Sequence, residues 1–204
     1  MKTTLSLILG GLLMFGQSAM AQTLTVSATV PPATGLQLTV TPINATSGVA
    51  GTSSTTATTI PFGTLTYNAS LGIYLPTNYY SVVIGTTGGA GTPIVSVTYA
   101  DTANPNNPSS LATNGLGTKA TATFVTVAGT TETVSSLGKK RLVDLTGTAG
   151  QLSTIPTGSY EKVYVGVWTG STTAPADPTN GQPFSNTDVG GTYSGNLTFT
   201  AVTL

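Results

Sequence analysis

Residues 22–30 read Gln-Thr-Leu-Thr-Val-Ser-Ala-Thr-Val and are followed at once by Pro31-Pro32. The apolar members of this alternating stretch share one face of an extended chain: Leu24, Val26, Ala28 and Val30. A strict period of two is typical of a β-strand with one buried face. The two prolines end the strand, because neither can donate a backbone hydrogen bond and both fix φ. The sequence therefore predicts a nine-residue strand that a proline hinge separates from the body of the protein.

The first 21 residues have the pattern of a bacterial secretory signal peptide. Lys2 supplies a positive charge, an apolar run extends from Leu5 to Phe15, and Ala19-Met20-Ala21 is a small-x-small cleavage site. The apolar run is shorter than the roughly 20 residues that a membrane-spanning helix needs. We therefore expect cleavage before Gln22, so that the alternating strand begins the mature chain, and export to the cell surface or beyond.

The composition is that of a charge-poor exported β protein. Charged residues form 6% of the chain, against about 25% in ordinary soluble domains. The chain contains neither cysteine nor histidine, so its stability must come from the core or from association. The net charge of zero offers no basic patch to nucleic acid or lipid headgroups and little repulsion between copies. We expect no nucleic-acid partner, no direct membrane span and no cofactor.

The remainder of the chain reads as a series of short strands. Thr, Ser and Gly dominate residues 44–59, which predicts an exposed loop or a weak edge ribbon. We expect Pro42 to end the first strand of the series, Gly63 to mark a bulge, and Gly138-Lys139-Lys140 to form a turn. Strands are expected at 35–41, 59–67, 79–86, 93–99, 120–128, 131–137, 141–145, 160–168 and in the closing segment 190–204.

This pattern predicts an all-β fold. Short strands that alternate with turn signals favour an antiparallel, immunoglobulin-like β-sandwich over residues 35–204, preceded by the N-terminal strand and hinge in residues 22–34. No segment after residue 21 has helical periodicity over two turns. In the closing segment, alternate residues share one face: Tyr193, Gly195, Leu197, Phe199 and Ala201.

The closing segment also resembles a known family. Gly191-Thr-Tyr-Ser-Gly195, running into Leu197-Thr-Phe-Thr200, is similar to the last strand of spore-coat-U-like fimbrial subunits of the archaic chaperone–usher type, and to related cysteine-free bacterial fimbrial domains. The Phe62-Gly63-Thr64 turn is similar to a motif early in those domains, and the alternating N-terminus looks like their donor strand. These motifs cover a minor part of the chain, which lacks the disulfide that the classical subunits often carry.

The resemblance implies a pilin that polymerises by donor-strand exchange. In such a filament each subunit lacks one strand, and the N-terminal strand of the next subunit completes its sandwich by β-augmentation. The implied partners are identical subunits in a homopolymer, with a periplasmic chaperone and an outer-membrane usher for assembly. The implied donor residues are Leu24, Val26, Ala28 and Val30, and the implied acceptor-groove residues are Tyr193, Leu197, Phe199 and Ala201.

Other interpretations stay open. Residues 22–30 can instead fold back into their own sandwich as an ordinary first strand, or form a disordered tail. The alternative function is a monomeric extracellular adhesin or carbohydrate-binding β-sandwich that stacks sugars on Trp168 and the tyrosines. Against this, one strongly apolar strand contains Tyr164, Val165, Val167 and Trp168, and core packing explains most of them.

Enzyme activity is the least favoured class, and we expect no catalytic or metal site. Without histidine and cysteine, His-based triads, thiol nucleophiles and most zinc or copper sites are excluded. The acidic residues are scattered singly and are interpreted as solvated loop and strand-edge charges: Asp101, Glu132, Asp144, Glu161, Asp177 and Asp188. Two groups carry oxygen ligands that suit calcium, although turn chemistry explains them as well: Asp177–Asn180 with Asp188, and Asp101 with Asn104 and Asn106.

Overall fold

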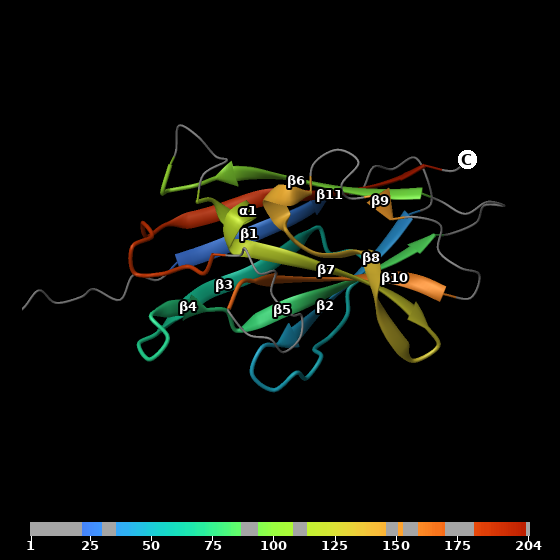
Figure 1. Ribbon diagram of the computed structural model, residues 1–204, viewed down its shortest axis with the longest axis horizontal. Helices are drawn as coiled ribbons and strands as arrows, with labels where there is room; N and C mark the ends of the chain where they lie inside the picture. The colour runs from blue at the N-terminus through green and yellow to red at the C-terminus, as the bar shows by residue number, and fades with distance from the viewer. Residues whose placement is uncertain are drawn as a thin grey trace, which may run out of the picture.

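The computed structural model describes residues 22–29, 36–86, 94–107, 114–145, 151–152, 159–169 and 182–202. Within these ranges the chain forms eleven strands, one short α-helix, α1 (Leu116–Lys119), and one 3-10 helix, η1 (Leu142–Asp144) (Figure 1). None of the described helices is long and apolar enough to cross a membrane. The strands are β1 (Gln22–Thr29), β2 (Leu36–Asn44), β3 (Thr59–Asn68), β4 (Ile73–Leu75), β5 (Asn78–Thr86), β6 (Ile94–Ala103), β7 (Ala120–Ala128), β8 (Thr131–Arg141), β9 (Gln151–Leu152), β10 (Ser159–Val167) and β11 (Thr192–Val202).

The strands form two sheets that pack face to face. Sheet A has the order β4-β3-β1-β11-β6-β9, and sheet B has the order β2-β5-β10-β7-β8. Every strand pair is antiparallel except β1 with β11, which run parallel. The prediction of an all-β, mostly antiparallel fold is therefore confirmed.

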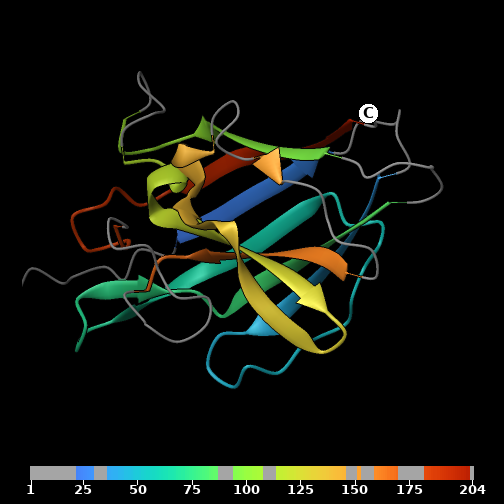
Figure 2. The ribbon, with the colours of Figure 1, turned by 45° about the vertical axis from the view of Figure 1, so that its right-hand side comes forward.

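The core lies between the sheets, where alternate residues of strands such as β10 face inward. Sheet B contributes Phe124, Val163 and Val165, all fully buried, from β7 and β10. At one end, α1 and η1 lie between β6 of sheet A and β7 of sheet B, where they bury Leu116 and Leu142 (Figure 2). These two short elements therefore close the space between the sheets where the chain crosses from one to the other.

Pro42 lies inside β2, so the prediction that it ends this strand is wrong. β2 is the edge strand of sheet B, and its pairing with β5 continues through Pro42 to Asn44. The missing N–H of proline is tolerated on an edge strand. The segment that follows covers the free edge, because the Gly51 N–H donates to the Pro42 carbonyl at 2.8 Å and Val40 forms an isolated bridge with Ser54.

β8 corrects the prediction of two strands separated by a turn at Gly138. Residues 131–141 form one edge strand, and the residues after it form η1. Gly138 adopts a φ of +62° near a register shift between β7 and β8, so the chain irregularity is a distortion within a continuous strand. Lys139 and Lys140 consequently lie on the edge of sheet B, where charged side chains oppose pairing with another sheet.

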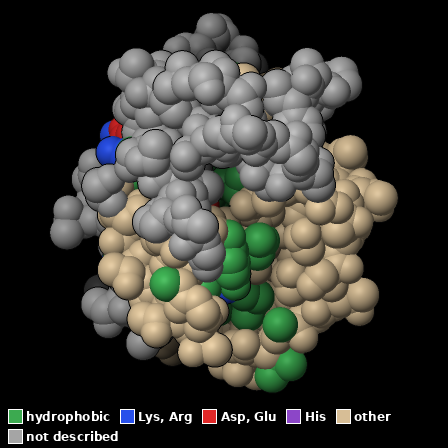
Figure 3. All heavy atoms as spheres, turned by 90° about the vertical axis from the view of Figure 1, so that its right-hand side faces the viewer, with side chains coloured by type: hydrophobic (Ala, Val, Ile, Leu, Met, Phe, Trp, Pro, Cys, Tyr) green, Lys and Arg blue, Asp and Glu red, His purple; other side chains and the backbone are tan. Residues whose placement is uncertain are grey.

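The surface is poor in charge, as the composition requires. Figure 3 shows one end of the molecule, where hydrophobic side chains gather in a strip between flanks of uncharged polar side chains and backbone. Only a few charged side chains are visible on this face. Such a surface gives little electrostatic repulsion between copies.

β11 contains a glycine that its neighbours require. The side chain of Tyr99 lies across Gly195, where an added Cβ would be 2.0 Å from Tyr99 Oη and 2.3 Å from Cζ. Tyr99 donates its hydroxyl to Asp101 Oδ1 at 2.7 Å, and the same oxygen accepts the Gly117 N–H at 2.9 Å. The register between β11 and β6 also shifts beside Gly195. The absence of a side chain at Gly195 therefore makes room for a tyrosine that is fixed from its other end.

We predict that Gly195→Ala destabilises the fold by about 1–3 kcal/mol, because a Cβ there overpacks against Tyr99. Urea unfolding of the purified protein measures the loss. Gly85→Ala in β5 is the matched control, since its Cβ would meet only the Gln37 carbonyl oxygen at an ordinary 3.6 Å. Equal losses in the two variants would contradict a specific clash at Gly195.

Candidate functional site

β1 occupies the middle of sheet A, between β3 and β11 (Figure 1). It pairs antiparallel with β3 from Gln22 to Ser27 and parallel with β11 from Thr23 to Thr29. β3 and β11 are neighbours of β1 and not of each other. Without β1, the described part of sheet A would therefore separate into β4-β3 and β11-β6-β9.

The register brings together part of the predicted donor and acceptor sets. Along the parallel pair, Leu24 lies opposite Tyr193, and Ala28 lies opposite Leu197. Between them, Val26 lies opposite Gly195. Three of the four predicted donor positions are thus aligned with the predicted groove strand.

The remaining predicted residues are placed differently. Val30 lies outside the described residues. Phe199 and Ala201 lie beyond the last described β1 pair, Thr29 with Thr198, and among the described residues they pair with β6. Of the pairings that the sequence left open, the single chain adopts the one within its own sheet. Exchange between chains stays a prediction.

β3 is held against sheet B by its own side chains. Ile60, Phe62 and Leu65 are buried at 0–2% exposure. The Phe62 ring meets the Tyr80 ring of β5 edge to face, with 5.7 Å between the centroids. The Tyr80 hydroxyl also donates to the Pro61 carbonyl, which ties β3 to the opposite sheet. β3 forms one wall of the site that β1 occupies, and β11 forms the other. The contacts of β3 with Tyr80 do not involve β1.

The bulge that the sequence predicted at Gly63 is present. β1 pairs Leu24 with Gly63 and then Thr25 with Pro61, so Phe62 is skipped in the register. Gly63 has a φ of +73°, a conformation that glycine adopts without steric cost. The bulge changes the register of β3 at the point where it borders β1.

β11 is the second wall and is also anchored without β1. Tyr193, Leu197 and Phe199 are fully buried between the sheets. The Tyr193 ring meets Phe184 edge to face at 4.8 Å, and its hydroxyl donates to the Val189 carbonyl at 2.7 Å. Burial, with the nearby Asp188 charge, raises the pKa of Tyr193, so its hydroxyl stays protonated and keeps donating at neutral pH.

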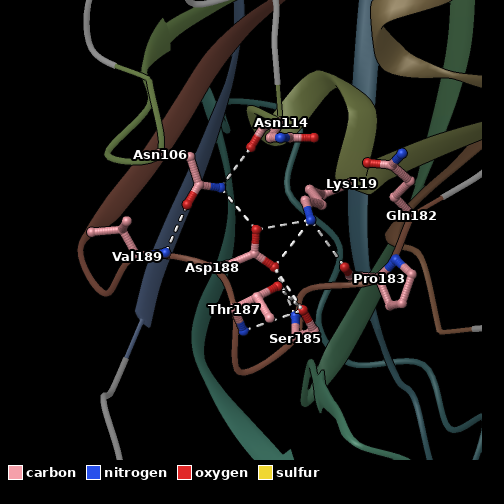
Figure 4. Close-up of a pocket in the computed structure, with 9 residues that line it drawn as sticks. All are labelled: Asn106, Asn114, Lys119, Gln182, Pro183, Ser185, Thr187, Asp188 and Val189. Atoms are coloured by element: carbon pink, nitrogen blue, oxygen red, sulfur yellow. Dashed lines mark hydrogen bonds and ion pairs between the residues drawn. The ribbon is translucent and has the colours of Figure 1, made fainter.

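A polar pocket of about 500 Å³ lies beside the start of β11 (Figure 4). Its central contact is an ion pair between Lys119 Nζ and Asp188 Oδ1 at 2.9 Å, with both side chains only 6% exposed. Lys119 also donates to the Pro183 carbonyl at 3.1 Å. We call this site the Asp188 pocket. Its ion pair links the last residue of α1, just before β7, to the loop that leads into β11.

Asn106 completes the network from the segment after β6. Its Nδ2 donates to Asp188 Oδ1 at 2.8 Å and to the Asn114 carbonyl at 2.9 Å, while its Oδ1 accepts the Val189 N–H at 2.7 Å (Figure 4). The Ser185 N–H donates to Asp188 Oδ2 at 2.7 Å. Asp188 therefore bonds to one cation, Lys119, and to two neutral donors, Asn106 and the Ser185 N–H. These three partners come from three separate segments of the chain.

These contacts correct the interpretation of the acidic residues as solvated charges. Asp188, a predicted calcium ligand, bonds the Lys119 ammonium, and Asp177 lies outside the described residues. Asp101, in the other predicted calcium group, bonds Tyr99 and Gly117, as described above. No group of three or more potential metal ligands among Asp, Glu, His and Cys forms within the described ranges.

Glu161 is the acid whose burial the sequence missed most clearly. It lies in β10 with 3% of its surface exposed, and the Thr126 hydroxyl donates to its Oε1. Its Oε2 has no hydrogen-bond partner. Burial raises the pKa of this carboxyl above the ordinary value, with the Thr126 bond acting in the opposite direction. The glutamate occupies an inward position in a strand whose alternation gave no sign of a buried charge.

Two acids fit the interpretation of strand-edge charges. Glu132 of β8 pairs with Lys162 at 2.5 Å, and Asp144 pairs with Arg141 at 2.7 Å, with both carboxylates 36% exposed. Hydrogen bonding to the cation lowers the pKa of each carboxyl despite some burial. These are surface ion pairs of the kind that contributes little to stability.

The prediction that core packing explains most of this strand holds for Val165 and Val167, which are buried, but not for Tyr164. The valines that alternate with it, Val163 and Val165, are fully buried. Tyr164 lies on the other face of β10, where its hydroxyl donates to Glu132 at 2.8 Å and its ring lies 6.1 Å from that of Tyr79. Trp168, just beyond β10, is partly buried.

A scan against models of protein families, a search of curated proteins and a search of solved structures each found no match. The function proposed below accordingly rests on the residues, the strand pairing and the resemblance in sequence motifs.

We predict that Lys119→Met destabilises the fold by about 3–5 kcal/mol, because it leaves the Asp188 carboxylate buried without its cation. Urea unfolding measures the change. Lys162→Met is the matched control, since its partner Glu132 is 36% exposed, and it should cost less than about 1 kcal/mol. Similar costs for both lysines would show that the Asp188 pair is not desolvated as described.

Glu161 predicts a pH dependence of stability. Its folded pKa is raised, so between the unfolded value near 4.3 and the folded value the native state holds a proton that the unfolded state has lost. The free energy of unfolding should therefore fall as the pH rises through this window. Urea unfolding from pH 4 to pH 8 should show this slope, and Glu161→Gln should reduce it because glutamine imitates the protonated acid. An unchanged slope in the variant would assign the effect to other groups.

Proposed function

We propose that this chain is an exported structural subunit that polymerises into a pilus or surface filament by exchanging β1 between copies. The observation that supports the proposal most directly is the position of β1 between two walls with side-chain contacts of their own. β3 contacts Tyr80 of sheet B, and β11 contacts Phe184 in the loop that precedes it. In this proposal the sandwich is immunoglobulin-like and β1 takes the place of the strand that is exchanged. The cleaved signal peptide would bring β1 to the mature N-terminus.

The energetics favour exchange as a low-cost event. A second copy offers the same strand sequence to the same two walls, so the backbone pairs formed between copies replace those lost within each copy. Each backbone hydrogen bond contributes about 0.5–1.5 kcal/mol net, and β1 uses both of its edges. Separation of an exchanged strand would have to break two ladders together, which makes the joint kinetically durable without a disulfide.

Geometry decides whether exchange gives a closed dimer or a filament. A strand donated to the next copy while that copy donates to a third is a head-to-tail contact, and a head-to-tail contact that does not close produces a filament. The pairing within one chain would protect the edges of β3 and β11 until exchange, because unpaired sheet edges invite aggregation. The sequence resemblance adds a periplasmic chaperone and an outer-membrane usher as the assembly partners of this proposal.

The alternative is a monomeric extracellular adhesin or carbohydrate-binding domain in which β1 remains permanently in its own sheet. The pairing within the single chain favours this alternative, and the charge-poor surface and the strand resemblance favour exchange. The two candidates differ in one measurable property, which is whether removal of β1 abolishes association.

We predict that deletion of residues 22–30 abolishes polymer formation by the processed protein, because the groove is then open but no strand is available to fill it. Gel filtration and electron microscopy of the full-length processed chain and the deletion variant make the comparison. Addition of a peptide with the sequence of residues 22–30 should occupy the groove and restore the thermal stability of the variant without restoring polymers.

A chain-mixing experiment provides the control. The deletion variant can accept a strand but cannot donate one, so adding it to the full-length processed chain should shorten the filaments in proportion to its amount. Val26→Asp, at the position opposite Gly195, should weaken donation because a charge would enter the interface. Polymers that persist after deletion, or a full-length chain that stays monomeric under all conditions of assembly, would reject exchange in favour of the monomeric alternative.

A further inference from the structure

We propose that the Asp188 pocket is a binding site for a neutral, hydroxyl-rich ligand, namely a single sugar unit or a short saccharide. The pocket has a volume of about 500 Å³, within the range of about 300–1,000 Å³ that is usual for small-ligand sites. It lies beside the loop that leads into β11 (Figure 4), and none of the described residues that line it comes from β1. The side chains that line it are mainly amides and hydroxyls, with the buried ion pair at its base: Asn106, Asn114, Lys119, Gln182, Thr187 and Asp188.

The charge of the pocket selects for a neutral ligand. Lys119 and Asp188 neutralise each other at 2.9 Å, and the Lys119 ammonium also donates to the Pro183 carbonyl at 3.1 Å. Asp188 in turn accepts hydrogen bonds from Asn106 and from the Ser185 N–H, as described above. An anion would have to displace Asp188, and a cation would have to displace Lys119. Each displacement leaves a buried charge unpaired, at a cost that a small ligand does not recover.

Two amide side chains of the lining are available to a ligand. The side chains of Asn114 and Gln182 line the pocket and have no hydrogen-bond partner among the described residues (Figure 4). A carboxamide both donates and accepts, and so does a sugar hydroxyl, which makes the two groups complementary. Asn114 is also the one non-glycine residue of the described ranges with a positive φ, at 52°. Asparagine adopts this left-handed conformation more readily than most other non-glycine residues.

The lining also offers apolar surface for the carbon-bound hydrogens of a sugar ring. Pro183 and Val189 both border the pocket, and Val189 is 50% exposed. A ligand with hydroxyls at its rim and C–H groups on its faces can bond the amides while it covers this apolar surface. A polar metabolite with a net charge would cover the apolar surface of Pro183 and Val189 poorly, and its charge would not match the neutral lining.

The test is saturation-transfer NMR and titration of the full-length processed chain with glucose, galactose, mannose and N-acetylglucosamine. Gluconate and glucosamine serve as charged analogues of similar size. We expect at least one neutral sugar to bind and both charged analogues to bind more weakly. Asn114→Gly removes one amide while keeping the positive φ, and Gln182→Ala removes the other from an exposed position. Each should weaken the affinity by about 2- to 10-fold, the loss of one hydrogen bond.

Gln37→Ala is the control, because it removes an exposed amide from β2, which contributes no residue to the pocket. It should leave the affinity unchanged, and circular dichroism should show all three variants folded. The proposal is overturned if none of the sugars binds, if both pocket variants bind like the parent chain, or if a charged analogue binds more tightly than its neutral counterpart. Filament formation is measured separately, so failure of sugar binding leaves β1 exchange standing.

Discussion

The backbone pairing of β1 with β3 and β11 is the interaction on which sheet A depends. A strand inside a sheet satisfies hydrogen-bonding groups on both of its edges. β1 does so between β3 and β11, which do not pair with each other. Every other described strand in sheet A is attached on one side or the other of this junction. The junction is made by the one segment of the described chain that precedes the body of the fold in sequence, so it is also the segment most easily supplied from elsewhere.

Each wall of the junction is fixed by side chains as well as by its ladder. On β3 the anchoring passes through Phe62 and the Tyr80 hydroxyl, and on β11 it passes through Tyr193 and Phe184. Each of these contacts involves residues outside β1. In the proposed exchange they would help each wall to keep its place while the central strand is replaced.

The sequence predicted the elements well because they depend on local periodicity. Alternation located β3, β5, β7 and β10, and the glycine at 63 marked a real bulge. The predicted strand end at Pro42 was wrong because the sequence does not reveal that β2 is an edge strand, where proline is tolerated. The predicted turn at Gly138 was wrong for a related reason. A glycine can end a strand or only distort it, and the outcome depends on pairing with the neighbouring strand.

The candidate sites were harder to predict because they depend on contacts between distant residues. Lys119 and Asp188 are far apart in sequence, and neither lies in a motif that predicts an ion pair. Their contact nevertheless bears on the groove. Asp188 fixes the loop that enters β11, and Thr192, the first residue of that strand, is also the partner of Thr23. The ion pair therefore helps to fix where β11 starts, and in the proposed exchange it would set where an incoming strand finds its first pair. A buried charge pair is a costly way to gain stability, but it accepts only one arrangement of its partners, which suits a loop that must hold a strand in register.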